Sequence, residues 1–237
     1  MKLRIVSSGL VLLLAGLLTC FSIAQDRSTT SPIVEIKDEP HHHAKFENEF
    51  VRVWETILPA GEQTYYHSHN FDNVAVVIAG AKMRMVPLMV TEPSSESETK
   101  LGDVGFRSAP YVHRAENSGT TAYDNLLVEL LKSPPAPKPI TLPPDEHPRH
   151  PVLENYRVRV YRVTLAPGES TPMHTHLFAG LALTLSPARI AIQTKGSKRV
   201  QRINVRAGEV RWRPEPVTHS IKNIGKTRFE GVDIELK

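Results

Sequence analysis

The sequence has only one cysteine and no long block of like charge. One cysteine among 237 residues cannot form an internal disulfide bond, which excludes a disulfide-stabilised scaffold. The 29 basic and 25 acidic residues nearly balance, whereas a dedicated nucleic-acid-binding protein would carry a clearer basic stripe. The G-x-S-x-G, P-loop and G-x-G-x-x-G patterns are also missing, which removes the common hydrolase and nucleotide-binding alternatives. We therefore expect no nucleic-acid partner.

The overall composition is that of an ordinary globular protein. Hydrophobic residues make up 40% and charged residues 23%, which excludes a disordered chain, a collagen and a polytopic membrane protein. The length suits two domains of about 100 residues each. The unusual features are 11 histidines and 19 prolines, and both are clustered in the sequence.

The N-terminus has the pattern of an export signal. Lys2 and Arg4 precede an apolar run over residues 5–18, and small residues then occupy the positions that a signal peptidase reads. Residues 1–24 therefore predict a Sec signal peptide, with a periplasmic or extracellular mature chain and no stable membrane span after cleavage. Two alternatives stay open, namely an uncleaved anchor and lipid attachment at Cys20.

The rest of the sequence contains an internal repeat. Residues 47–69 align without gaps with residues 154–176, with 11 identities in 23 positions. Residues 102–121 align in the same way with residues 208–227, with 8 identities in 20 positions and nearly the same offset. Two separated blocks with one offset indicate a duplicated unit.

The repeat sets the predicted domain boundaries. We expect one domain over residues 45–131 and a second over residues 152–237. Between them, residues 132–151 contain eight prolines, which sustain neither a helix nor a central strand, so this segment is predicted to be the linker. The polar stretch 91–100 is expected to be a loop within the first domain.

Short strands dominate the secondary structure that the sequence predicts. The segments are rich in β-branched, aromatic and leucine residues and are bounded by Gly, Pro, Asn or Asp. No long stretch has the 3.6-residue periodicity of an amphipathic helix. The fold class is therefore all-β, a sandwich or barrel, with strands expected at 50–54, 74–78, 125–131, 156–163 and 229–236.

Six histidines fall at equivalent places in the two copies. Each copy has a His-x-His pair, and on a strand these two imidazoles lie on one face. A third histidine follows about 44 residues later in each copy, so three imidazoles are expected to converge on a metal. Neutral imidazole suits Zn, Cu, Fe and Ni, and three ligands leave positions open for water or substrate. The expected cofactor is a divalent transition metal, one of Fe, Zn, Mn, Ni or Cu. The predicted ligands are His67, His69 and His113 in the first copy and His174, His176 and His219 in the second.

These spacings resemble those of the cupin family. The first cupin motif, G-x5-H-x-H-x3,4-E-x6-G, is matched from Gly61 to Gly80 and again from Gly168. The second, G-x5-P-x-G-x2-H-x3-N, is matched from Gly102 to Asn117 and again from Gly208, with substitutions at its proline and second glycine. The resemblance implies a bicupin, two tandem double-stranded β-helix (jelly-roll) barrels, each with a metal cavity.

The glutamate of the first motif is missing from both copies. Asn73 stands in its place in the first copy and Gly180 in the second, while strand alternation from His69 points Asp72 away from the cavity. Each site therefore has three histidines and no carboxylate. Such a site leaves the metal charge uncompensated, which favours an anionic substrate or a water of lowered pKa. Asn73 still offers a carbonyl oxygen as an additional ligand.

Several other residues are weaker candidates. Tyr65 shares strand parity with His67 and either lines the first cavity or packs in the barrel. Arg107 and Arg213 either hold an anionic substrate or face outward from their strands. Two asparagines, Asn117 and Asn223, are expected to support turns. The run at residues 41–43, three consecutive histidines, is expected to be a polar segment before the first strand, with metal binding as the alternative.

Two functions from different classes follow from these features. The first is a metalloenzyme, a non-haem metal-dependent oxygenase or isomerase acting on a small molecule. The second is a non-catalytic metal- or ligand-binding structural cupin, suggested by the missing glutamates and the lack of a clear acid or base. The catalytic residues are undetermined in either case. A homodimer is a further possibility, since cupins often pair barrel edges.

Overall fold

The structure is a computed structural model that describes residues 33–88, 94, 96–135, 150–214 and 216–237. The predicted signal peptide and most of the predicted linker lie outside these residues. Among the described residues, no helix is long and apolar enough to span a membrane. The regular secondary structure of the described residues is β-strand, as the sequence predicts, apart from one short 3-10 turn at Ile36–Asp38.

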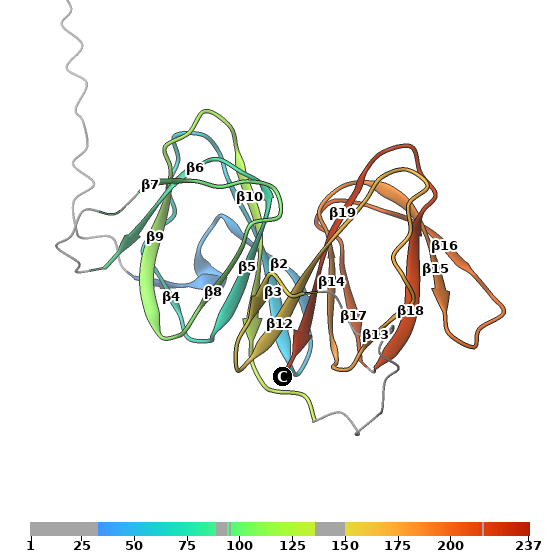
Figure 1. Cartoon of the computed structure of the whole chain (residues 1–237). Coiled ribbons are helices and arrows are strands. Elements are labelled where there is room, and N and C mark those ends of the chain that lie inside the picture. The colour runs from blue at the N-terminus through green and yellow to red at the C-terminus, as the bar shows by residue number, and fades with distance from the viewer. Residues whose placement is uncertain (1–32, 89–93, 95, 136–149, 215) are drawn as a thin grey trace, which may run out of the picture. The chain divides into compact units, whose positions relative to one another are not determined.

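The first half of the chain forms one barrel of two facing sheets (Figure 1, blue to green). One sheet has the order β1-β4-β9-β6-β7 and the other β2-β3-β10-β5-β8. The strands are β1 (Val34–Glu35), β2 (His42–Glu47), β3 (Val51–Leu58), β4 (His67–His69), β5 (Asn73–Ala79), β6 (Lys82–Pro87), β7 (Glu96–Glu98), β8 (Val104–Arg107), β9 (Tyr111–Asn117) and β10 (Tyr123–Leu130).

The second half repeats this arrangement (Figure 1, yellow to red). Its sheets have the orders β11-β12-β19-β14-β17 and β13-β18-β15-β16. The strands are β11 (Leu153–Glu154), β12 (Val158–Leu165), β13 (His174–His176), β14 (Gly180–Thr184), β15 (Ala188–Thr194), β16 (Gln201–Val205), β17 (Val210–Arg213), β18 (Val217–Asn223) and β19 (Phe229–Leu236). The duplicated sequence thus gives duplicated topology.

Two features of the first barrel differ from the sequence-based expectation. Glu96–Glu98 form strand β7, paired with β6, within a stretch expected to be a loop. Its side chains are exposed, which explains why this edge strand has no apolar pattern. Strands β1 and β2 begin before residue 45, so the barrel includes an N-terminal segment that the repeat does not contain.

One apolar cluster joins the two barrels. In β10, Leu126 and Val128 are fully buried on the face opposite to Asn125 and Leu127. Val232 and Ile234 of β19 belong to the same cluster, which therefore packs one sheet of each barrel against the other. Alternation along the strands leaves the opposite face of each sheet directed into its own barrel.

Polar contacts reinforce this contact between the barrels. Asp72 accepts hydrogen bonds from the Tyr156 hydroxyl at 2.9 Å and from the Arg157 guanidinium at 3.2 Å. Phe50 stacks on Trp212 with ring centroids 5.6 Å apart. Asp72 is thus occupied outside the cavity, on the side to which strand alternation assigns it.

The shared cluster generates a prediction about cooperativity. Replacing Leu126 with alanine removes a fully buried side chain from the cluster, and such changes cost about 2–5 kcal/mol. We expect Leu126→Ala to lower the denaturant midpoint of both barrels in a single transition. Ile57→Ala, at a position of β3 that is 40% exposed, is the matched control and should shift the midpoint little. Separate transitions for the two barrels in the variant would contradict the prediction.

Candidate metal centre

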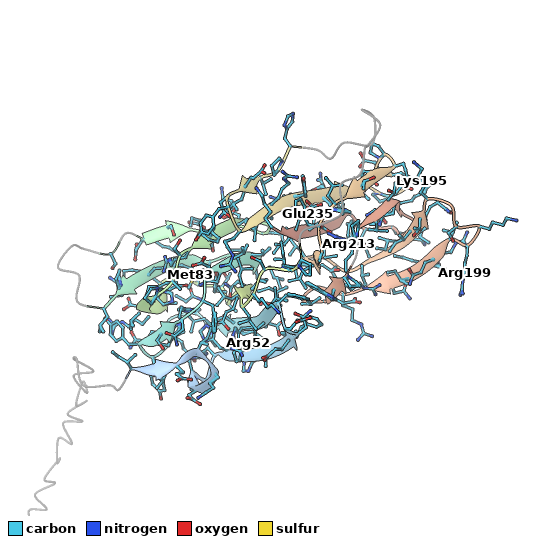
Figure 2. The ribbon with its side chains drawn as sticks, turned by 90° about the horizontal axis from the view of Figure 1, so that it is seen from below. Arg52, Met83, Lys195, Arg199, Arg213 and Glu235 are labelled. Atoms are coloured by element: carbon cyan, nitrogen blue, oxygen red, sulfur yellow. The ribbon has the colours of Figure 1, made fainter. Side chains whose placement is uncertain are left out.

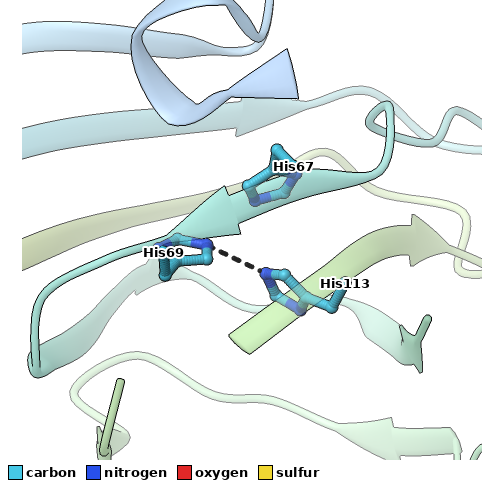
Figure 3. Close-up of side chains that lie close together, drawn as sticks. All are labelled: His67, His69 and His113. Atoms are coloured by element: carbon cyan, nitrogen blue, oxygen red, sulfur yellow. Dashed lines mark hydrogen bonds between the residues drawn. The ribbon is translucent and has the colours of Figure 1, made fainter. Parts of the chain in front are cut away.

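Three histidines of the first barrel converge on one point (Figure 3). His67 and His69 are alternate residues of β4, and β9 places His113 directly opposite His67. The ring centroids are 4.7 to 5.0 Å apart. One nitrogen from each ring lies within 4.8 Å of the others, and Nε2 of His69 is 3.1 Å from Nε2 of His113. This is the grouping that the His-x-His spacing predicts.

The surroundings of these rings keep them neutral and aimed inward. His67 Nδ1 donates to the Tyr65 carbonyl at 2.9 Å, so its Nε2 is directed into the site, where it has no protein partner. Burial, with the neighbouring imidazoles second, lowers the pKa of His67 to about 4 and that of His113 to about 2. The same causes lower the pKa of His69 further. Neutral imidazoles are the form that binds metals.

A cavity of about 180 Å³ lies beside the three histidines. Its walls include Asn73, Phe106, Arg107 and Tyr111, and none of the described residues that line it is Asp or Glu. The cavity therefore suits a small molecule.

Arg107 lies at the outer end of this cavity. It is exposed, stands over the Tyr111 ring at 4.9 Å and approaches His113 Nδ1 at 3.4 Å. No ion pair joins it to a carboxylate within the described part of the chain. Arg107 therefore lines the cavity, and the prediction that it holds an anionic substrate stays a prediction. A guanidinium without a carboxylate partner is suited to bind an anion.

Asn73 and Tyr65 differ in their relation to the cavity. Asn73 lines it, but its amide exchanges hydrogen bonds with the Tyr111 hydroxyl at 2.8 and 3.1 Å, so the carbonyl oxygen already has a partner. Tyr65 is 52% exposed and does not line the cavity. The expectation from strand parity fails because β4 begins only at His67. Tyr111, which sequence reasoning missed, lines the cavity and stacks on His69 at 4.5 Å; parity with His113 is the signal that would have found it.

A fourth histidine lines the same cavity. His42 of β2 lies with its ring centroid 4.7 Å from that of His67, and its Nδ1 donates to Glu39 at 2.6 Å. The expectation that residues 41–43 form a polar segment before the first strand is wrong, because β2 pairs with β3 and turns His42 inward. Neither His42 nor Glu39 belongs to the repeat, so no internal alignment could indicate them.

Glu39 is a buried carboxylate that holds several donors. It accepts from His42 and from the backbone N–H groups of His41 at 2.9 Å and Tyr65 at 3.2 Å. Burial disfavours its charged form. The His42 hydrogen bond and charge, with the two backbone bonds, outweigh burial and keep the pKa of Glu39 below its usual value. Glu39 thus fixes the orientation of the His42 ring.

The second barrel contains the corresponding histidine triad. His174 and His219 are paired across β13 and β18, and Nε2 of His174 is 3.2 Å from Nε2 of His176. Burial, followed by the neighbouring imidazoles, lowers the pKa of His219 to about 3. His174 Nδ1 donates to the Pro172 carbonyl at 2.9 Å, as His67 does to Tyr65. The nitrogen atoms again lie within 4.8 Å of one another.

Two carboxylates contact a histidine of the second site. His176 Nδ1 lies 3.1 Å from Glu235 and 3.3 Å from Asp233, both on β19. Arg213 donates to Asp233 at 2.7 Å and to the Phe178 carbonyl, so it neither faces outward nor is available to an anion. Sequence reasoning missed both carboxylates, although they lie on one strand face at i and i+2.

Gly180 lies between these charged residues. It is paired with Arg213 on one neighbouring strand and with Glu235 on the other. Arg213 and Glu235 are labelled in Figure 2. A Cβ at Gly180 would lie 2.1 Å from the Ile234 carbonyl oxygen. The position that holds Asn73 in the first barrel therefore has no room for a side chain in the second.

The interior of the second barrel is less polar than that of the first at matching positions. The strand registers align Thr56 with Val163 and Asn125 with Gly231, and Ala115 with Ile221. The second barrel's own apolar cluster contains Val163, Leu165, Ile190, Val205 and Phe229, with Ile192 and Ile221 packed against it. A polar cavity wall in the first barrel is thus replaced by apolar packing in the second.

The two asparagines of the second motif support turns, as the sequence predicts. Asn117 donates to the Leu58 and Thr121 carbonyls and accepts from the Gly119 N–H. Asn223 makes the same set of bonds in the second barrel. The amide and carbonyl groups of both side chains are hydrogen-bonded to the backbone. These asparagines therefore support turns, and the histidine of the motif is the residue that enters each site.

Comparison with solved structures shows the fold. AerE from Microcystis aeruginosa matches with a TM-score of 0.58 at 12% identity, covering 84% of this chain and 98% of that chain. The Mn(II)-containing oxalate decarboxylase of Bacillus subtilis matches with a TM-score of 0.56 at 15% identity, covering 89% and 78%. A Cupin 2 conserved barrel domain protein from Leptotrichia buccalis gives 0.50 at 12% identity, covering 88% and 92%. No family model and no curated protein matches the sequence. The chain has the cupin fold, as its motifs indicate.

The depressed histidine pKa values predict a pH dependence of stability. An unfolded histidine titrates near 6.5, whereas His67 titrates near 4 in the folded chain, so the unfolded state binds more protons between these values. After metal removal with a chelator, stability should be full above pH 6.5 and fall as the pH drops toward 4. His67 should contribute roughly 1–2 kcal/mol of the loss between pH 7 and pH 5.

Urea unfolding of the chelator-treated protein at pH 7 and pH 5 measures this effect. His67→Gln should show a shallower loss than the wild type, while His43→Gln, at an exposed position of β2, should show the same loss as the wild type. An equal loss in all three proteins would contradict the prediction.

Proposed function

We propose that this chain is an exported bicupin that binds a divalent transition metal through His67, His69 and His113 and acts on a small anionic molecule in the cavity of the first barrel. The observation that carries the proposal is the coincidence, in this barrel, of three inward-facing neutral imidazoles, an adjoining cavity and an arginine without a carboxylate partner.

The residues of the first site fit a metal ion. His67 Nε2 is buried without a partner, and the other two Nε2 atoms face each other with no acidic group between them. A polar atom buried without a partner costs free energy that a ligand would recover. Three imidazoles suit Fe, Zn, Mn, Ni or Cu, and the Mn(II) of the structurally similar oxalate decarboxylase supports this range.

The bound metal would supply Lewis-acid or redox chemistry with open coordination positions. The chain's own contribution is to hold and orient the substrate. Arg107 would pair with the anionic group at the outer end of the cavity, and Tyr111, fixed by Asn73 and His69, would form the wall beside it. Phe106 and the other apolar wall residues would limit the access of water. An oxygenase or isomerase of a small molecule fits this inventory.

The second barrel would have a supporting role. Its Arg213 is already paired with Asp233, and Val163 and Ile221 stand where Thr56 and Ala115 line the cavity in the first barrel. Two carboxylates at His176 Nδ1 match the outer partners that orient histidine ligands in closed metal sites. We propose that any metal held there stabilises the barrel.

A non-catalytic binding function is the second candidate. It is favoured by the absence of Asp and Glu from the wall of the first cavity, which leaves no carboxylate as a general acid or base. In that case the same site would hold a metal and a small ligand without turnover. A homodimer is compatible with either function.

Metal analysis of the chain, exported through its own leader, tests the metal proposal. The wild type should retain about one equivalent or more of a transition metal per chain. His67→Ala/His69→Ala should lose the metal of the first barrel, while the matched variant His174→Ala/His176→Ala should leave it in place. A wild type that stays metal-free after reconstitution with Fe(II), Mn(II), Ni(II), Cu(II) and Zn(II) would refute it.

Turnover distinguishes the two candidate functions. The metal-loaded protein is offered a panel of small carboxylates, phosphates and oxygenase substrates, with and without oxygen. Turnover that disappears in the first-barrel variant and persists in the second-barrel variant supports the metalloenzyme. Metal binding without any turnover supports the binding protein.

A further inference from the structure

Three polar side chains form a row across the inner wall of the first cavity. His42, Thr56 and Asn125 are cross-strand neighbours on β2, β3 and β10, and all three line the cavity. On β10, Asn125 lies four residues from Glu129. Glu129 is in register with Asn73 on β5, and Asn73 is in register with Arg107 on β8. Measured along the strands, the backbone of this row therefore lies roughly 13 Å from the backbone of Glu129, Asn73 and Arg107.

The row is buried and is made of groups that form hydrogen bonds. The side chain of His42 is 5% exposed, and Thr56 and Asn125 are 5% and 6% exposed. Asn125 Oδ1 is buried without a protein partner in the described structure. Because an unsatisfied buried amide is costly, its presence in a cavity wall points to a bound partner.

The orientation of His42 is fixed from behind. Glu39 accepts its Nδ1–H at 2.6 Å, so the Nε2 edge of the ring is the one available to the cavity. His42 is close to His67 but does not join the group of nitrogen atoms that lie within 4.8 Å of one another. Its ring centroid is 6.4 Å from that of His69, compared with 4.8 Å between His67 and His69. His42 thus stands beside the three predicted ligands and not among them.

The second barrel shows that this row is not required by the fold. Val163 and Gly231 stand where Thr56 and Asn125 stand in the first barrel. Strand β11 has two residues, whereas β2 has six and extends to His42. The second barrel therefore folds with valine and glycine at these two positions. The polar side chains at the matching positions of the first barrel are thus not needed for folding and call for another explanation.

We infer that His42, Thr56 and Asn125 form a hydrogen-bonding subsite for a hydroxyl group of the small anion bound in the first cavity. A hydroxyl both donates and accepts, so it can satisfy an imidazole nitrogen, a threonine hydroxyl and an amide together. The class of ligand is a small hydroxylated anion, with its charged end toward Arg107 and the histidines. This inference rests on the proposed function and specifies its substrate class.

Matched pairs of carboxylates test the subsite. The pairs are propionate and 3-hydroxypropionate, butyrate and 4-hydroxybutyrate, and benzoate and 4-hydroxybenzoate, titrated by calorimetry into the metal-loaded full chain. The readout is the ratio of the two dissociation constants within each pair. In at least one pair the wild type should bind the hydroxylated member about tenfold or more tightly, the effect of one well-made hydrogen bond to a buried polar group.

Three variants test the assigned residues. Thr56→Val/Asn125→Leu keeps the volume of the row and removes its polarity, and His42→Gln removes the imidazole; both should bring the ratio close to one. Glu39→Gln weakens the hold on the His42 ring, so it should reduce the ratio in part. His43→Ala, at an exposed position on the same strand, is the matched control and should keep the wild-type ratio. A merely structural defect would weaken both members of a pair alike and leave the ratio unchanged.

The outcomes separate this inference from the proposed function. Metal content is measured in every sample, so a wild type without metal counts against the proposed function, while the ratio still reports on the subsite. Equal affinities within every pair, no measurable binding of any carboxylate, or a wild-type ratio retained in Thr56→Val/Asn125→Leu would overturn the inference. If the hydroxyl instead bound the metal directly, Thr56→Val/Asn125→Leu would keep the wild-type ratio, because chelation does not depend on these side chains.

Discussion

The apolar face shared by the two barrels is the constraint on which the site depends. Leu126 and Val128 pack in one cluster with Val232 and Ile234, so each of these sheets has one face committed to the other barrel. Because side chains alternate across a strand, the remaining face of each sheet must point into its own barrel. In β10 the face directed into the barrel carries Asn125, Leu127 and Glu129, and the first two line the cavity. The packing of Leu126 and Val128 between the barrels thus determines which residues of β10 face the cavity.

The duplicated unit has kept its framework and changed its interior. The turns built by Asn117 and Asn223 are the same bond for bond, and both histidine triads converge. The differences lie at the positions that face inward. Thr56 is matched by Val163 and Ala115 by Ile221, and the arginine at the outer end is paired with a carboxylate only in the second barrel. The first copy thus has Arg107 beside a cavity, while in the second copy the matching arginine is paired with Asp233 and Ile221 packs against the apolar cluster.

Burial explains why imidazoles are suited to the first site without a carboxylate ligand. His67 and His113 lie in surroundings that disfavour their charged forms, so they remain neutral and available to a metal over the physiological range. Glu39 has the opposite role. It stays ionised behind His42, where it orients a ring and does not reach the triad. Separation of the carboxylate from the three imidazoles leaves the positive charge of a bound metal to be balanced by an anion from solution.

The sequence by itself determined the all-β fold, the duplication and the grouping of the histidines. Period-two alternation and the His-x-His spacing are local properties of a strand, and the duplication makes each pattern visible twice. Only the tertiary structure decided which side chains line the cavity of the first barrel, because these come from eight strands that pack together. It also decided the positions of His42, Glu39 and Arg107. Their neighbours are set by strand pairing between distant segments, and a run of three histidines in sequence does not reveal which one a neighbouring strand turns inward.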